Sequence, residues 1–242
     1  MGLAAGLLVD LDPALLAIVR RSLFVSASAT AVAALLGLPL GAWLAVRRLR
    51  LQGLVLLLLN TLLALPSVVV GLLVYLLLSR TGPLGFLGWL YSLPAMVLAQ
   101  SVLVLPVVSA LVRQTVADAD ALQGEPLRSL GAGPWVRGAL LAWNERTALI
   151  TVLITAFGRA VSEVGAVMIV GGNMDGFTRV MTTAIALETS KGDLPLALAL
   201  GLVLLLVVLT LHGLVALLRR WRAQADAGVA APRAGVSEGI VP

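Results

Sequence analysis

Arg159 and Glu163 are the two residues whose type and spacing most directly suggest chemistry. They stand four positions apart within TALITVLITAFGRAVSEVGAVMIVGG, an otherwise apolar run. Four residues bring two side chains to the same face of a helix, and a charge at membrane depth is costly enough to suggest a function. Two interpretations follow. The pair is a structural ion pair within one helix, or the arginine attracts a passing anion while the glutamate keeps its binding weak.

No catalytic set is visible elsewhere in the sequence. The single histidine, His212, lies in an apolar run, where a packed helix residue is the expected role. The chain has no cysteine and no glycine-rich phosphate loop ending in Lys-Ser or Lys-Thr. A membrane-embedded enzyme would need paired carboxylates or a histidine cluster at a common depth, and neither is found. We therefore predict a protein that is not an enzyme and has no cofactor or metal, with energy supplied by a partner or a gradient.

Composition predicts an all-α integral membrane protein. Apolar residues make up 60% of the chain, charged residues 12%, and the mean hydropathy is +1.05. Continuous apolar runs exceed the ~20 residues that a spanning helix needs, and they lack the alternation of a membrane β-barrel. A fifth run qualifies if Arg159 and Glu163 face protein or water. The predicted spans, about five, are 22–46, 51–79, 81–112, 147–170 and 194–218.

The ends of the chain differ from this predicted transmembrane domain, 22–222. Residues 1–21 form a predicted external segment in which Asp12 and Pro13 suggest a helix start. The helix after Pro13 either lies on the membrane surface or simply extends the first span. Residues 223–242 are rich in Ala, Gly and Pro without apolar periodicity, so we predict a disordered cytoplasmic tail.

The basic residues between spans predict the orientation. With the N-terminus outside, eleven basic residues fall on the cytoplasmic side and five on the outer side, as the positive-inside rule requires. The net charge of +5 then reports cytoplasmic loops and no nucleic-acid partner. The inner residues are Arg47, Arg48, Arg50, Arg113, Arg128, Arg137, Arg146, Arg219, Arg220, Arg222 and Arg233, and the outer ones are Arg20, Arg21, Arg80, Arg179 and Lys191.

The longest cytoplasmic loop, residues 118–146, is predicted to be a helical elbow. A Gly-Ala-Gly-Pro break at 131–134 separates two short helical pieces, and we expect the elbow not to continue the preceding helix. An element that docks into a cleft of another protein needs exposed apolar anchors and a polar rim. The anchors are Leu122, Leu127, Leu130 and Trp135, and the rim residues are Glu125 and Arg128.

Prolines and polar residues within the spans suggest broken helices. The prolines admit ordinary packing kinks as one interpretation. The sharper one is that breaks at Pro66-Ser67 and around Gln100-Ser101 line a pathway. The candidate path residues are Ser67, Gln100, Ser101, Arg159, Ser162 and Glu163. On the outer side, residues 171–193 are predicted to form a loop with a short interfacial helix at 180–189 that a partner could touch.

The elbow resembles the coupling loop of ABC importer permeases, whose signature is Glu-Ala-Ala, three residues, then Gly. Glu125, Arg128, Ser129, Leu130, Gly131 and Ala132 stand in that pattern, although Pro126 and Leu127 replace the two alanines and Trp143-Asn144 replaces a following Leu-Pro. Residues 22–218 are similar to the tungstate type of these permeases. The similar stretches are LPSVVVGLLVYLLLSRTGPLG, PAMVLAQSVLVLPVV, FGRAVSEVGAVMIVGGN and TRVMTTAIALETSKGD.

This resemblance implies a type I (MetI-like) importer architecture in the inner (plasma) membrane, with the C-terminus in the cytoplasm. It implies a homodimer with cytoplasmic ATP-binding subunits, an external substrate-binding protein and surrounding membrane lipid, importing tungstate or a related oxyanion. Discrimination between tungstate and molybdate is expected in the external protein. The rival is a secondary transporter driven by an ion gradient through Glu163 and Arg159, but no internal repeat is found.

Overall fold

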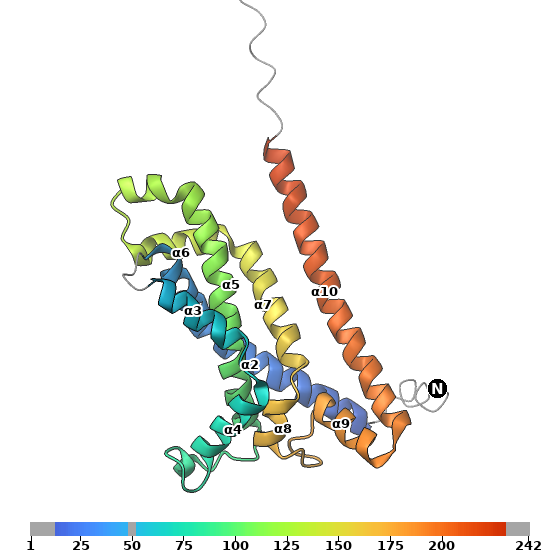
Figure 1. Ribbon diagram of the computed structural model, residues 1–242. Helices are drawn as coiled ribbons and strands as arrows, with labels where there is room; N and C mark the ends of the chain where they lie inside the picture. Colours follow the sequence, from blue (N-terminus) through green and yellow to red (C-terminus); the bar gives the residue numbers. More distant parts are fainter. Residues whose placement is uncertain (1–12, 48–51, 231–242) are drawn as a thin grey trace, which may run out of the picture.

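The computed structural model describes residues 13–47 and 52–230, and this part of the chain is helical, without strands. The all-α prediction is therefore confirmed (Figure 1). The elements in chain order are α2 (Pro13–Val46), α3 (Gln52–Leu63), α4 (Ser67–Leu78), η1 (Gly85–Leu87), α5 (Leu93–Ser129), α6 (Pro134–Asn144), α7 (Arg146–Val161), α8 (Gly165–Gly171), α9 (Met181–Lys191) and α10 (Leu194–Ala230).

Three of these helices are long and apolar enough to cross a membrane, namely α2, α5 and the Leu194–Leu218 part of α10. Two further pairs pass the same test but are bent, α3 with α4 by 94° and α6 with α7 by 81°. Up to five spans are thus possible within the described residues, in agreement with the predicted number. At ~1.5 Å per residue, the 16 residues of α7 measure about 24 Å, and α8 follows it toward the other end of the bundle (Figure 1).

Helices α2 and α5 form the central pair, and glycines let them approach closely. A Cβ added at Gly41 would lie 2.6 Å from the carbonyl oxygen of Ser109, and one at Gly37 would lie 2.9 Å from Val108. Small residues at helix contacts allow such approach in membranes. Pro39 and Pro106 lie inside α2 and α5 without ending them, which fits the packing-kink interpretation.

The remaining helices pack around this pair. Helix α4 lies on α8, and α10 runs beside α7 and α9 (Figure 1). Many leucines of α10 are exposed, among them Leu205 and Leu209 at 66% and 70%. An apolar exposed face of this kind is suited to lipid or to another membrane helix.

Three predicted boundaries are corrected. The span that begins at residue 81 in the prediction begins at Leu93, because Gly82 and Gly85 sit in tight turns where a Cβ would lie 2.1 and 2.3 Å from backbone oxygens. Helix α2 is continuous from Pro13, so the residues after Pro13 extend the first span; Asp12 and residues 1–12 lie outside the described residues.

The predicted disordered tail is the third correction. Helix α10 continues to Ala230, through residues 223–230, because four alanines and a glutamine in this segment are good helix formers and neither proline nor a glycine pair interrupts them. Residues 231–242 of the predicted tail lie outside the described residues.

Candidate functional site

The elbow is built differently from its sequence prediction. Helix α5 does not stop at the start of the elbow but continues without interruption to Ser129, because residues 118–129 are mostly good helix formers. The helix ends where Gly131 takes a φ of 78°, a left-handed conformation that glycine adopts without strain. Pro134 then opens α6. The break at 131–134 is confirmed, whereas the separation of the elbow from the preceding helix is wrong.

Most of the predicted docking residues are exposed at the tip of this elbow. Leu122, Leu130 and Trp135 are 84%, 83% and 63% exposed, which leaves three large apolar side chains free to contact another protein. Two residues are partly covered: Leu127 packs against the core, and Ala132 is half-buried. The exposed polar and glycine positions are Glu125, Arg128, Ser129 and Gly131.

A buried ion pair, not identified from the sequence, holds the elbow together. Arg137 on α6 is 8% exposed, and its Nε lies 2.9 Å from Oδ1 of Asp120 on α5. The other oxygen, Oδ2 of Asp120, lies 2.8 Å from Nη2 of Arg128. Nη2 of Arg137 also donates to the carbonyl of Val46, the last residue of α2. This cluster, called here the Asp120 clamp, therefore fastens α5, α6 and α2 to one another.

The sequence carried one signal for this clamp. Arg137, Gly138 and Leu141 are the buried residues of α6, and they share one face at helical spacing. Gly138 makes the contact possible, because a Cβ there would lie 3.1 Å from the carbonyl oxygen of Ala42 on α2. In the sequence, Arg137 counts only toward the basic residues of the cytoplasmic side. An arginine next to a glycine on the apolar face of a short helix nevertheless indicates a buried partner.

Two helix breaks meet on the opposite half of the bundle. The predicted break at Pro66-Ser67 is confirmed, since α3 and α4 are bent by 94° there. The second break lies at residues 162–164, between α7 and α8. A Cβ at Gly165 would lie 2.8 Å from Oγ of Ser67, and one at Gly71 would lie 2.8 Å from Cα of Ala166. Glycines thus let the two breaks touch.

The predicted break around Gln100 and Ser101 is wrong, because α5 is continuous there. Nε2 of Gln100 donates to the carbonyl of Ala160 on α7 at 2.9 Å. Oγ of Ser101 donates to the Val97 carbonyl of its own helix at 2.7 Å. Both side chains are buried, at 3% and 6% exposure. Both side chains donate to backbone carbonyls within the helix bundle while α5 stays intact, and Oε1 of Gln100 is buried without a hydrogen-bond partner among the described residues.

The interpretation of Arg159 and Glu163 as an ion pair within one helix is also wrong. Helix α7 ends at Val161, so Glu163 is no longer on the helix that carries Arg159. Glu163 is 7% exposed, and its Oε1 accepts from the backbone N–H of Ala166 at 3.3 Å. Arg159 is exposed and, within the described part of the chain, forms no ion pair. Because α7 ends at Val161, the carboxyl of Glu163 contacts the start of α8.

Polar contacts also secure the backbone around Glu163. Its N–H donates to the carbonyl of Ala160 at 3.1 Å, and its carbonyl accepts from Oγ1 of Thr182 on α9 at 2.7 Å. Ser162 is exposed, and its hydroxyl donates back to Gly158 at 3.0 Å. Thr182 therefore belongs to this site, although the sequence analysis placed it only in an external loop.

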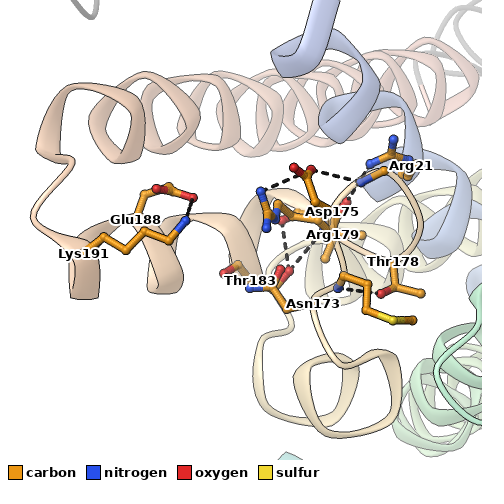
Figure 2. A network of polar contacts seen from close by, with 11 residues as sticks. Arg21, Asn173, Asp175, Thr178, Arg179, Thr183, Glu188 and Lys191 are labelled. Atoms are coloured by element: carbon orange, nitrogen blue, oxygen red, sulfur yellow. Dashed lines mark hydrogen bonds and ion pairs between the residues drawn. The ribbon is translucent and has the colours of Figure 1, made fainter.

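The short helix predicted at 180–189 is confirmed as α9, and Figure 2 shows the polar network that joins it to the loop after α8. Nδ2 of Asn173 donates to the Thr183 carbonyl at 3.2 Å, and Nη1 of Arg179 lies 3.2 Å from Oδ1 of Asp175. Nη1 of Arg21 on α2 donates to the Arg179 carbonyl at 3.5 Å. This network fixes the loop against α9 and against the first turns of α2.

One ionisable group near this loop is perturbed. A side-chain hydrogen bond with Tyr75 raises the pKa of Tyr91, so the Tyr91 phenol stays protonated and neutral at physiological pH. The two rings meet edge to face at 6.2 Å. Tyr91 also has a φ of 62°, and its N–H donates to the carbonyl of Val170 on α8 at 2.9 Å.

Comparison with known proteins places these features in context. Residues 37–224 match the family described as binding-protein-dependent transport system inner membrane component. The tungstate uptake system permease protein TupB of Peptoclostridium acidaminophilum is 43% identical over 88% of this chain and 93% of its own length. A probable anion ABC transporter permease protein of Haloferax volcanii is 39% identical over 85% and 90%. The molybdenum transport system permease protein ModB of Escherichia coli is 31% identical over 72% and 82%.

The first prediction separates the two kinds of arginine found here. Replacing Arg137 by Gln removes one of the two cationic partners of Asp120 and leaves Arg128 as the other, so we expect the free energy of unfolding to fall by about 1 to 3 kcal/mol. Arg159→Gln removes an exposed and unpaired charge, so we expect a change within about 0.5 kcal/mol. Denaturant unfolding of both purified variants in detergent measures the difference. Equal losses in the two variants would contradict the assignment of a buried pair to Arg137 alone.

Proposed function

The chain belongs to the family of binding-protein-dependent transport system inner membrane components, and from this premise we propose that it is the permease subunit of an ABC importer for tungstate. The observation that carries the proposal is the 43% identity to a tungstate uptake permease, which extends over 88% of this chain. The family implies a cytoplasmic ATPase and an external substrate-binding protein as partners. The rival hypothesis of a secondary transporter loses its support, because the Arg159 and Glu163 pair on which it depended is not formed.

In the proposed mechanism the ATPase binds the exposed tip of the elbow. Leu122, Leu130 and Trp135 provide apolar anchors, and Glu125 and Arg128 provide polar contacts at their edge. The Asp120 clamp keeps α5 and α6 in a fixed relation, so movement of the tip shifts both helices together. Because α5 reaches from the elbow through the membrane as one helix, the shift is delivered directly to the spanning part of the permease.

The proposed path for the oxyanion lies beside the two helix breaks. Arg159 and Ser162 are exposed next to one break, and Ser67 is half-buried at the other. Arg159 offers positive potential to a tetrahedral oxyanion, and its exposure without a bound carboxylate leaves that charge free to hold the anion weakly and transiently. Gln100 and Ser101 are buried in helix contacts, so their proposed role is packing beside this path.

A homodimer is part of the proposal. An exposed arginine at membrane depth needs protein or water around it, since lipid does not solvate a charge. Val68, Val164 and Met168 surround the breaks and are 56%, 39% and 39% exposed. A second copy that covers this face would enclose Arg159 in a shared, water-accessible path between the two copies.

The transport assay tests the proposal directly. Proteoliposomes that contain the permease, its ATPase and its external binding protein should accumulate tungstate only when ATP is on the elbow side. Molybdate and sulfate serve as competitors, and proteoliposomes without the ATPase serve as the control. Uptake driven by an ion gradient without ATPase would contradict the proposal and restore the secondary transporter.

The proposed orientation places the N-terminus outside and the elbow in the cytoplasm. The chain has no cysteine, so single cysteines can be introduced without a background signal. Ser129 and Asp175 are both exposed, one at the elbow tip and one in the loop after α8. A membrane-impermeant thiol reagent applied to intact cells should label Asp175→Cys but label Ser129→Cys only after the membrane is opened. Labelling of both from outside would overturn this topology.

Gly131 provides the test of coupling. A side chain at its φ of 78° costs about 1 to 2 kcal/mol and redirects the elbow tip. We expect Gly131→Leu to insert normally but to lose most ATP-dependent uptake or ATPase association, as measured by copurification and vesicle transport. Gly133→Leu is the matched control, because Gly133 has a φ of −63° and space for a Cβ. Normal uptake in Gly131→Leu would contradict a coupling role for this turn.

A further inference from the structure

An apolar groove lies beside the elbow, away from the helix breaks, and shares only Trp135 with the elbow tip. It has a volume of about 390 Å³ and is formed by α2, α6 and the first half of α7. Leu38, Leu149, Ile150 and Leu153 contribute aliphatic side chains to it. Helix α6 lies at a sharp angle of 81° to α7, so the groove is closed at one end by a helix that crosses the end of the span. A groove of this form runs along the spanning helices, as a lipid acyl chain does, and ends near the polar surface of the membrane.

Tryptophans surround this groove. Trp43, Trp135 and Trp143 line it, which is three of the five tryptophans in the chain. The rings of Trp43 and Trp135 lie 5.8 Å apart, and Trp135 and Trp143 are 63% and 69% exposed. Indole side chains gather where the hydrocarbon of a membrane gives way to its headgroups, because one end is apolar and the other forms hydrogen bonds. The groove therefore ends at headgroup level.

Two arginines stack on tryptophans of the groove, and one of them, Arg146, also lines it. The guanidinium of Arg47 lies 4.9 Å from the centre of the Trp43 ring, and that of Arg146 lies 5.7 Å from the Trp143 ring. Nη1 of Arg146 also donates to the Trp143 carbonyl at 3.2 Å. Both arginines are exposed, neither belongs to an ion pair of the described residues, and no acidic residue lines the groove. The charge that lines the groove is therefore positive, since Glu145, which precedes Arg146 in the chain, is not among the lining residues.

We propose that this groove binds an anionic phospholipid from the leaflet that borders the elbow. The acyl chain lies along the aliphatic residues of α2 and α7, and the phosphate lies between Arg47 and Arg146. Basic pockets between membrane helices on the cytoplasmic side bind anionic headgroups for this electrostatic reason. The proposal rests on the proposed function only in placing the elbow at the membrane boundary.

Such a lipid contacts α2 and α6, two of the three helices that the Asp120 clamp joins. Ala42 and Gly138, which pack α2 against α6, also line the groove. The lipid therefore acts as an additional apolar support beneath α6, on the side away from the exposed elbow tip. The ATPase and the lipid then share only Trp135, whereas Trp43 and Trp143 line the groove without belonging to the elbow tip.

Tryptophan fluorescence tests the proposal on the full permease. Trp89→Phe with Trp221→Phe leaves the three groove tryptophans as the only emitters. This protein is placed in phosphatidylcholine vesicles that contain either brominated phosphatidylglycerol or brominated phosphatidylcholine as quencher. We expect phosphatidylglycerol to quench with a relative association constant about fivefold or more above that of phosphatidylcholine, because each basic residue adds attraction for anionic lipid. Equal quenching by the two lipids would overturn the proposal.

Two further variants locate the lipid. Arg47→Gln with Arg146→Gln should bring the preference close to one, whereas the matched pair Arg20→Gln with Arg21→Gln, near the other end of α2, should keep it. Ala139→Phe fills the groove without changing its charge and should lower maximal quenching by phosphatidylglycerol. A preference that survives the Arg47 and Arg146 changes, or quenching unaffected by Ala139→Phe, would refute the site.

The same assay distinguishes other occupants. Addition of the ATPase should leave quenching by phosphatidylglycerol unchanged. Loss of quenching on that addition would assign the groove to the ATPase, and absence of quenching by both lipids would assign it to a second copy of the permease. Each of these results overturns the lipid proposal. Because the readout needs no transport, its failure is distinguishable from failure of tungstate uptake.

Discussion

Backbone hydrogen bonding inside the membrane is the constraint on which this structure depends. Hydrocarbon offers no partner for a free N–H or C=O, so a helix break at membrane depth must be enclosed and satisfied by protein. The break after α7 meets this demand through one residue, Glu163. Its carboxyl accepts from Ala166, its N–H donates to Ala160, and its carbonyl accepts from Thr182. At the break after Pro66, Gly71 and Gly165 let α4 and α8 pack closely against each other.

The same constraint explains why the two charged residues near this break behave differently. Glu163 is buried where it replaces missing backbone partners, so its environment is set by the break itself. Arg159 remains on α7 and is exposed, so within one copy it has no structural task to perform. In a buried ion pair the glutamate would neutralise the charge of the arginine. In this arrangement the positive charge of Arg159 stays available to an anion.

Sequence reasoning found the elements that depend on composition and turn chemistry. The apolar runs, the break at Pro66, the turn at Gly131 and the helix before Lys191 all follow from local signals of this kind. It failed where a tertiary contact decides. The spacing of Arg159 and Glu163 predicts an ion pair only if the helix continues, and nothing in the three residues between them predicts that it stops at Val161.

The misinterpreted polar residues failed for a related reason. Gln100 and Ser101 correctly indicated that polar groups at membrane depth need hydrogen-bond partners. Those groups are backbone carbonyls of intact helices, including that of Ala160 on the neighbouring helix. Asp120 and Arg137 are 17 positions apart, on helices that meet only after the chain turns at Gly131. A pair of this kind is visible in sequence only as an arginine on the apolar face of α6.

Helix α2 connects the two polar clusters that this chain builds at its opposite ends. At one end Val46 accepts from Arg137 and Trp43 lies against Trp135, so α2 is held by the elbow. Near the other end Arg21 donates to the carbonyl of Arg179 in the loop after α8. The 34 residues of α2 measure about 51 Å as one helix at ~1.5 Å per residue. A displacement of the elbow therefore reaches the opposite loop through one continuous element, unless α2 bends at Pro39 and absorbs the movement there.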